Sequence, residues 1–210
     1  MNWRLINKDP SKQPRNGNYS DWKNQIAIEC FYQCVYCSIH EAQFGGIDNY
    51  HIDHFRPKSR KEFEQLTNDI CNLFYACPIC NRFKSDDWPG EPDLNTSSYP
   101  DPSKVDYTTL FRLTNDFELE GLYTASKYLI LRLFLNRFQL IMERREATRR
   151  AQVQGLIEII TGLVDSLTRP DIEFALDIMK KLDSIKNNLL GLEEHRRRIR
   201  PYEIADIRKP

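Results

Sequence analysis

The sequence predicts an α+β protein that is mainly α, with a small metal-stapled lobe followed by a C-terminal helical region. Two Cys-x-x-Cys pairs, Cys34/Cys37 and Cys77/Cys80, bracket a segment that reads as strand, turn and short helix. Beyond residue 123, apolar residues recur at spacings of three and four, which is the pattern of amphipathic helices. A chain of 210 residues with 40% apolar content is long enough for one domain or two small ones.

The four paired cysteines give the most specific chemical signal. Each Cys-x-x-Cys forms a tight knuckle, and two knuckles complete the tetrahedron of a structural zinc site. Such zinc binding contributes about 10–16 kcal/mol of apparent free energy and is coupled to folding. Four unrelated buried thiols are the plain alternative, and disulfides are disfavoured without a secretory signal. We predict structural Zn²⁺ at Cys34, Cys37, Cys77 and Cys80, and buried apolar thiols at Cys30 and Cys71.

A set of polar residues lies on the segments that this cage would join. Asp53 and His54 are neighbours on a predicted strand, residues 49–58, so their side chains point to opposite faces. The carboxylate can hold a hard divalent cation while the imidazole takes a proton from water. Asn81 directly follows the last cage cysteine and offers an amide oxygen, a ligand that also suits Mg²⁺ or Mn²⁺.

The motifs Cys-x-x-Cys, Asp-His-x-x-Pro, Asn-Leu and Cys-x-x-Cys-Asn-x-x-Lys follow one another within residues 20–90. Together they resemble the HNH (ββα-metal) endonuclease family in its zinc-stapled His-Asn-Asn form. The resemblance implies a ββα-metal core in which His54 is the general base, with Asp53 and Asn81 as ligands of the catalytic metal. It also implies that Asn72 tethers the loop and orients the base, and that His51 is an auxiliary metal residue.

A longer motif, His-x-Asp-His-Phe-x-Pro-Lys-Ser with a later Asp101-Pro102, narrows this resemblance. It is similar to the HNH nucleases of bacterial anti-phage systems, including Septu and retron-associated members. The resemblance then implies two partners, DNA and an ABC-type ATPase. Two alternatives remain: a stand-alone restriction-type endonuclease, and a non-catalytic zinc-stapled nucleic-acid-binding module. The acid, imidazole and amide together favour an enzyme, because a pure binding module has no use for them.

Basic residues close to the predicted site are candidates for contact with DNA phosphates. The formal net charge is zero, which excludes a uniformly basic surface, so either the basic residues are local or a partner supplies affinity. A run of charges is most often simply a solvated face. Beside a metal site, however, we expect phosphate contacts. The candidates are Arg56, Lys58, Arg60 and Lys61 after the His54 motif, and Lys84 at the end of the short helix.

The predicted organisation has three parts: an irregular N-terminal arm (1–19), a nuclease domain with the cysteine cage (20–122) and the helical region (123–210). Within the nuclease domain we expect a helix from residue 20 to 31, a short helix from Pro78 to Lys84, and a hairpin formed by residues 107–113 and 117–122.

The helical region is predicted to begin at Thr124 and to continue through an apolar stretch at residues 128–135. A later helix is predicted to open at Pro170, so that two amphipathic helices form a hairpin. This hairpin either stabilises the fold or docks the ATPase or a second copy. No apolar run is long enough to span a bilayer and no signal-peptide pattern is present, so we expect a cytoplasmic protein without a membrane partner.

Overall fold

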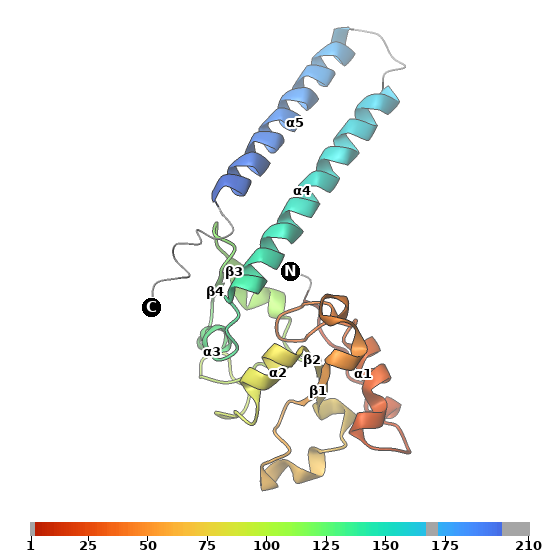
Figure 1. Ribbon diagram of the computed structural model, residues 1–210, viewed down its shortest axis with the longest axis vertical. Coiled ribbons are helices and arrows are strands. Elements are labelled where there is room, and N and C mark those ends of the chain that lie inside the picture. The colour runs from red at the N-terminus through yellow and green to blue at the C-terminus, as the bar shows by residue number, and fades with distance from the viewer. Residues whose placement is uncertain (1–2, 167–171, 199–210) are drawn as a thin grey trace. The chain divides into compact units, whose positions relative to one another are not determined.

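The computed structural model describes residues 3–166 and 172–198, and the chain divides into two compact units, residues 1–143 and 144–210. The first unit contains both small sheets, helices α1 to α3 and the start of α4 (Phe138–Ser166) (Figure 1). The second contains the rest of α4, and α5 (Ile172–Arg198). The described chain is therefore mainly helical with small two-stranded sheets, as predicted. The predicted helix start at Pro170 lies outside the described residues.

A β-hairpin and a short helix form the centre of the first unit (Figure 1). Strand β1 (His51–His54) pairs antiparallel with β2 (Leu73–Ala76), and His54 lies opposite Leu73. Helix α2 (Pro78–Lys84) follows β2 after a single residue, with Pro78 at its first position, where the missing N–H costs nothing. Strand β1 is shorter than the predicted 49–58. A 3₁₀ turn, Ile47–Asn49, precedes it, and the chain bends away after it.

The predicted helix at 20–31 consists of two pieces, a 3₁₀ turn (Tyr19–Trp22) and α1 (Lys23–Glu29). The turn is capped by Asn18, whose side chain accepts a bond from Ser20 N. After α1, Phe31 and Tyr32 both adopt a left-handed φ of 57°. This conformation stops the helix and turns the chain toward Cys34.

The predicted hairpin is present as β3 (Phe111–Leu113) and β4 (Leu119–Gly121), which pair antiparallel. Gly121 allows β4 to approach α3 (Thr124–Arg132), because a Cβ there would lie 2.6 Å from Lys127 N. The apolar stretch 128–135 is not one continuous helix. Helix α3 ends at Arg132, and Phe134 takes a left-handed φ of 48° before α4 begins.

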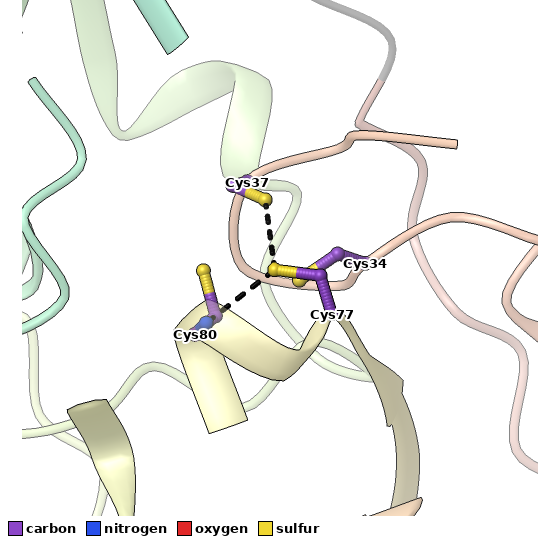
Figure 2. Close-up of side chains that lie close together, drawn as sticks. All are labelled: Cys34, Cys37, Cys77 and Cys80. Carbon is purple, nitrogen blue, oxygen red and sulfur yellow. Dashed lines mark hydrogen bonds between the residues drawn. The ribbon is translucent and has the colours of Figure 1, made fainter. Parts of the chain in front are cut away.

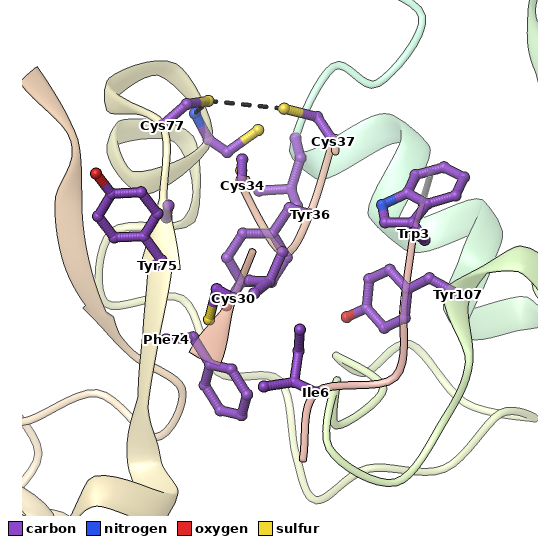
Figure 3. Packing of buried hydrophobic residues seen from close by; sticks show 14 of the residues in the cluster. Trp3, Ile6, Cys30, Cys34, Tyr36, Cys37, Phe74, Tyr75, Cys77 and Tyr107 are labelled. Atoms are coloured by element: carbon purple, nitrogen blue, oxygen red, sulfur yellow. Dashed lines mark hydrogen bonds between the residues drawn. The ribbon is translucent and has the colours of Figure 1, made fainter. Parts of the chain in front are cut away.

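One buried cluster runs through the first unit and includes residues of the N-terminal arm (Figure 3). Trp3 stacks on Phe111, with ring centroids 5.1 Å apart, and Ile6 N bonds to Pro102 O at 3.0 Å. Tyr36, between Cys34 and Cys37, and Phe74 of β2 are fully buried in the same cluster. The arm thus completes the core of the first unit, although its described residues before Tyr19 contain no regular strand or α-helix. Within the described residues, no helix has both the length and the apolar character needed to cross a membrane.

Candidate active site and cysteine cage

Four cysteine sulfurs from two parts of the chain meet beside the start of α2 (Figure 2). Cys34 and Cys37 come from the turn after α1, while Cys77 and Cys80 belong to the β2–α2 junction. All four Sγ atoms lie within 4.8 Å of one another, and Cys37 Sγ is 3.7 Å from Cys77 Sγ. Tetrahedral zinc with Zn–S bonds of about 2.3 Å requires sulfurs about 3.8 Å apart. The predicted metal-binding cluster is confirmed, and its donors fit Zn²⁺.

The backbone holds both knuckles of this cage. Val35 N donates to Tyr75 O at 3.0 Å, which ties the first knuckle to β2, and Cys80 N donates to Cys77 Sγ at 3.4 Å. Burial raises the pKa of Cys34 well above its usual range. Hydrogen bonds from Cys34, Cys37 and Cys80 lower the pKa of Cys77.

The guanidinium of Arg137 lies against the cage, a contact that the sequence analysis missed. Its Nη1 is 3.8 Å from Cys80 Sγ, and its Nη2 is 3.8 Å from Cys37 Sγ and 4.0 Å from Cys77 Sγ. Burial disfavours the charged form, but the charges of Cys80, Cys37 and Cys77 outweigh it and raise the pKa of Arg137. No local pattern could have predicted this contact, because Arg137 lies 57 residues from Cys80 and 100 from Cys37.

His54, the predicted general base, is buried and held by one hydrogen bond. Its Nε2 lies 3.0 Å from Thr67 O. A carbonyl oxygen only accepts, so Nε2 carries the proton, and in the neutral ring Nδ1 is left as an acceptor. Burial lowers the pKa of His54, with Lys58 acting in the same direction, so the ring is neutral near pH 7. A neutral imidazole with a free acceptor nitrogen is the form that a general base requires.

Asn72 clamps the loop between β1 and β2. Its Oδ1 accepts from Arg56 N at 2.8 Å, and its Nδ2 donates to Arg56 O at 3.1 Å and to Leu66 O at 3.3 Å. Thr67, whose carbonyl holds His54, comes directly after Leu66. The buried amide therefore fixes both ends of the loop that carries the acceptor for His54.

Asp53 lies 3% exposed between two donors. Lys84 Nζ is 3.1 Å from Asp53 Oδ1 and also donates to His54 O at 2.7 Å, while Tyr36 Oη donates to Asp53 Oδ2 at 2.6 Å. The prediction that Lys84 contacts DNA phosphate is wrong, because this side chain is completely buried. The prediction assumed that Lys84, as the last residue of a short helix, faces solvent. The helix instead directs it inward, where Asp53 offers an opposite charge.

Asn81 and His51 are more exposed to solvent than Asp53. Asn81 shares a face of α2 with Lys84, three residues away, and its side chain is partly exposed and makes no hydrogen bond to other described residues. His51 shares a face of β1 with Asp53 but is exposed. The metal-binding roles of all three residues stay predictions.

The four remaining basic candidates belong to the loop between β1 and β2 and are partly or fully exposed. Arg56 pairs with Glu91 at 2.6 Å and lies over the ring of Trp88, so its positive charge is partly neutralised by Glu91. Arg60 approaches Glu62 at 3.9 Å, and Lys61 is exposed. Lys58 is exposed as well, and its Nζ donates to Tyr19 Oη at 2.5 Å. Phosphate contacts by these residues stay predictions.

The N-terminal arm also reaches His54, a contact that no sequence motif indicates. The Tyr19 ring packs edge-on against His54, with centroids 4.7 Å apart. Tyr19 N donates to Asn68 Oδ1 at 2.9 Å, and Gln13 Nε2 donates to Asn68 O at 3.0 Å. The arm thus supports the loop residue directly after Thr67. An irregular arm carries no periodic signal, and only the folded chain shows this contact.

Residues 34–87 match the family model described as HNH endonuclease. The matched segment contains both cysteine pairs, β1, β2 and α2, so the chain carries an HNH endonuclease domain and is a nuclease enzyme on that ground. No curated protein and no solved structure matches the chain.

Proposed function

We propose that this domain is a metal-dependent endonuclease that hydrolyses phosphodiester bonds of DNA, with His54 as the general base. The observation that carries the proposal is the bond from His54 Nε2 to Thr67 O, which leaves Nδ1 as the acceptor of a proton from water. Asn72 holds the loop from which that carbonyl projects, and thereby orients the imidazole. Burial keeps the ring neutral, so it is ready to accept a proton at pH 7.

Asp53 and Asn81 would hold the catalytic Mg²⁺ or Mn²⁺, for which an all-oxygen donor set is suitable. The bound cation would stabilise negative charge on the phosphate and on the leaving oxygen. Each oxygen of a carboxylate accepts more than one bond, so Asp53 has acceptor capacity beyond Tyr36 and Lys84. Those two donors fix the carboxylate, and Lys84 shares it with any added cation.

The general-base role is tested by His54→Ala in single-turnover cleavage of labelled duplex and single-stranded DNA with Mg²⁺ or Mn²⁺. Loss of a general base is expected to slow cleavage by about 10²–10⁴-fold. The matched control is His40→Asn, since His40 is exposed and Asn preserves the acceptor that caps Ala42 N. Zinc content and circular dichroism should be unchanged in both variants. Cleavage by His54→Ala at the unsubstituted rate would refute the role.

The metal-ligand roles require a separate readout, for which we choose calorimetric binding of Mn²⁺. Asn81→Ala removes an oxygen donor with no other described bond, so it should weaken Mn²⁺ binding without loss of stability. Asp53→Asn should weaken it too, and should also destabilise the fold because Lys84 is left buried without a counter-charge. If Asp53→Asn binds Mn²⁺ as the parent does, Asp53 serves the fold and is not a ligand.

We further propose that the nuclease is the effector of an anti-phage system and acts with an ATPase partner. The anti-phage role is suggested only by the resemblance of the motif at residues 51–59. Two features support a partner. The net charge of zero gives little non-specific attraction to DNA, so a partner would supply affinity. Apolar side chains also remain exposed at three- and four-residue spacings on α4 and α5: Val153, Ile157, Ile160, Leu176, Met179 and Leu182. A partner bound there would raise the local concentration of the domain at DNA.

The ATPase proposal is tested by co-purification with an ATPase encoded beside this chain and by cleavage with and without it. Met179→Glu should abolish the complex and leave the basal cleavage of the isolated chain unchanged, since Met179 is 63% exposed. Asn188→Glu is the control, because Asn188 is exposed on the opposite face of the same helix. Rapid plasmid cleavage by the isolated chain at physiological salt would contradict the proposal. Disruption of a homodimer by Met179→Glu would assign the surface to a second copy instead.

A further inference from the structure

Arg137 contacts three of the four cage sulfurs although it lies outside both cysteine motifs. Its two terminal nitrogens reach Cys37, Cys77 and Cys80 at 3.8–4.0 Å, so the guanidinium covers one face of the cluster. The residue as a whole is partly buried, but its Nε is fully buried and makes no hydrogen bond to other described residues, so this N–H has lost contact with water. Such burial has a cost that a surface arginine does not incur.

Charge supplies a reason for this position. Four thiolates around one Zn²⁺ leave two net negative charges, and the cysteines that carry them are buried. A positive charge beside them offsets part of that charge, and N–H donors facing the sulfurs reduce their reactivity. The planar guanidinium can face several sulfurs together, which a single ammonium cannot do.

The same guanidinium also holds the turn between α3 and α4. Nη1 donates to Leu133 O at 3.2 Å, while Phe134 packs on Phe83 of α2 with ring centroids 4.7 Å apart. Both contacts lie within the first unit. The turn is therefore joined to the cage by one side chain and to α2 by an aromatic pair.

We propose that Arg137 is the charge-neutralising cover of the zinc cage: it retains the metal, protects the thiolates and fastens the α3–α4 turn to them. This inference depends on the cysteine cage and is independent of the proposed nuclease mechanism. It predicts that zinc retention and the order of the turn change together when the guanidinium is removed.

The test uses the full chain carrying zinc, with Arg137→Met as a neutral replacement of similar length. Competition with a chromophoric chelator should show zinc affinity lowered about 10–100-fold, the usual effect of removing a partner of ligating groups. Alkylation of the cage cysteines by N-ethylmaleimide, followed by mass spectrometry, should be faster. Hydrogen exchange at residues 133–137 should rise as well. Arg112→Met is the control, because Arg112 pairs with Glu120 on an exposed hairpin away from the cage.

Arg137→Lys keeps the charge without the planar fork and should fall between the parent and Arg137→Met in all three measurements. It also decides the result if Arg137→Met does not fold. The proposal is overturned if a folded Arg137→Met matches Arg112→Met in zinc affinity and alkylation rate. It is equally overturned if Arg137→Lys is indistinguishable from the parent when Arg137→Met cannot be purified.

Discussion

The two ends of the β1–β2 hairpin are held by different chemistry. At the end where His51 faces Ala76, the chain runs straight into Cys77 and the metal cage. At the end where His54 faces Leu73, the neighbouring Asn72 closes the loop with three hydrogen bonds to Arg56 and Leu66. One end is fixed by four sulfurs suited to a metal, and the other by a single amide. We infer that the first end determines whether the lobe folds, and the second whether His54 is aligned.

The largest effect is expected at the cage. Cys77→Ser, or removal of zinc by a chelator, should unfold the nuclease lobe, because zinc contributes about 10–16 kcal/mol of binding free energy to small sites of this kind. Elemental analysis should show zinc lost and circular dichroism should show structure lost. Cys71→Ser is the control, since Cys71 lies outside the cluster and is only partly buried. If the zinc-free chain keeps the melting temperature of the zinc-loaded chain, the inference that the cage end of the hairpin determines folding is wrong.

At the loop end, Asn72→Ala should affect activity more than folding. Three hydrogen bonds are lost and backbone groups of Arg56 and Leu66 lose their partner, at a cost of about 1–3 kcal/mol in stability. The carbonyl of Thr67 is then no longer fixed. Cleavage should fall toward the level of His54→Ala, by up to about 10²–10⁴-fold. Exposed Asn95→Ala serves as the control.

Measurement of zinc content is what distinguishes the two ends in that experiment. Asn72→Ala should bind zinc as the parent does, because the amide lies at the opposite end of the hairpin from Cys77. Parent-like cleavage by a folded Asn72→Ala would show that Thr67 is held without the clamp.

The two ends also differ in how far they could be predicted. The cysteine pairs, the Asp-His dipeptide and the hairpin-helix order are local patterns, and a family model spanning residues 34–87 identifies the same segment. The inward direction of Lys84 was predicted wrongly, since the end of a seven-residue helix gives no sign of which face is covered. Arg137 and Tyr19 were missed because they approach the site across long sequence separations. Such contacts depend on the packing of the whole unit.

A smaller effect is expected where the matched segment joins α3. Asp87 accepts from Tyr99 Oη at 2.7 Å, from Arg132 Nε at 3.0 Å and from Tyr128 Oη. Burial opposes the charged form, but these donors outweigh it and lower the pKa of Asp87. Because the pKa of Asp87 is lowered in the folded state, its carboxylate stabilises the fold fully at a pH above the usual carboxyl pKa. This contribution is lost as the pH falls from that value through the lowered pKa. Cage thiolates would be protonated there too, so substitution at pH 7 is the cleaner test.

Asp87→Asn should lower the free energy of unfolding by about 1.5–3 kcal/mol, the range for hydrogen bonds to charged groups. Chemical denaturation of the zinc-loaded chain measures this change. Asp116→Asn, at an exposed turn, should change it little. Equal stability of Asp87→Asn and the parent would mean that α3 is held to the segment by apolar packing alone.

The smallest effect is expected from Tyr19, which belongs to the loop end of the comparison. Its ring packs on His54, and its hydroxyl accepts from Lys58 Nζ. An aromatic pair contributes about 0.5–1.5 kcal/mol, so Tyr19→Ala should slow cleavage by about 2–13-fold. Tyr19→Phe retains the ring and should lose less, while Tyr32→Phe, at an exposed ring beside His40, should lose nothing. If Tyr19→Phe instead loses as much as Tyr19→Ala, the hydroxyl–Lys58 contact, and not the ring, is what the arm contributes to the site.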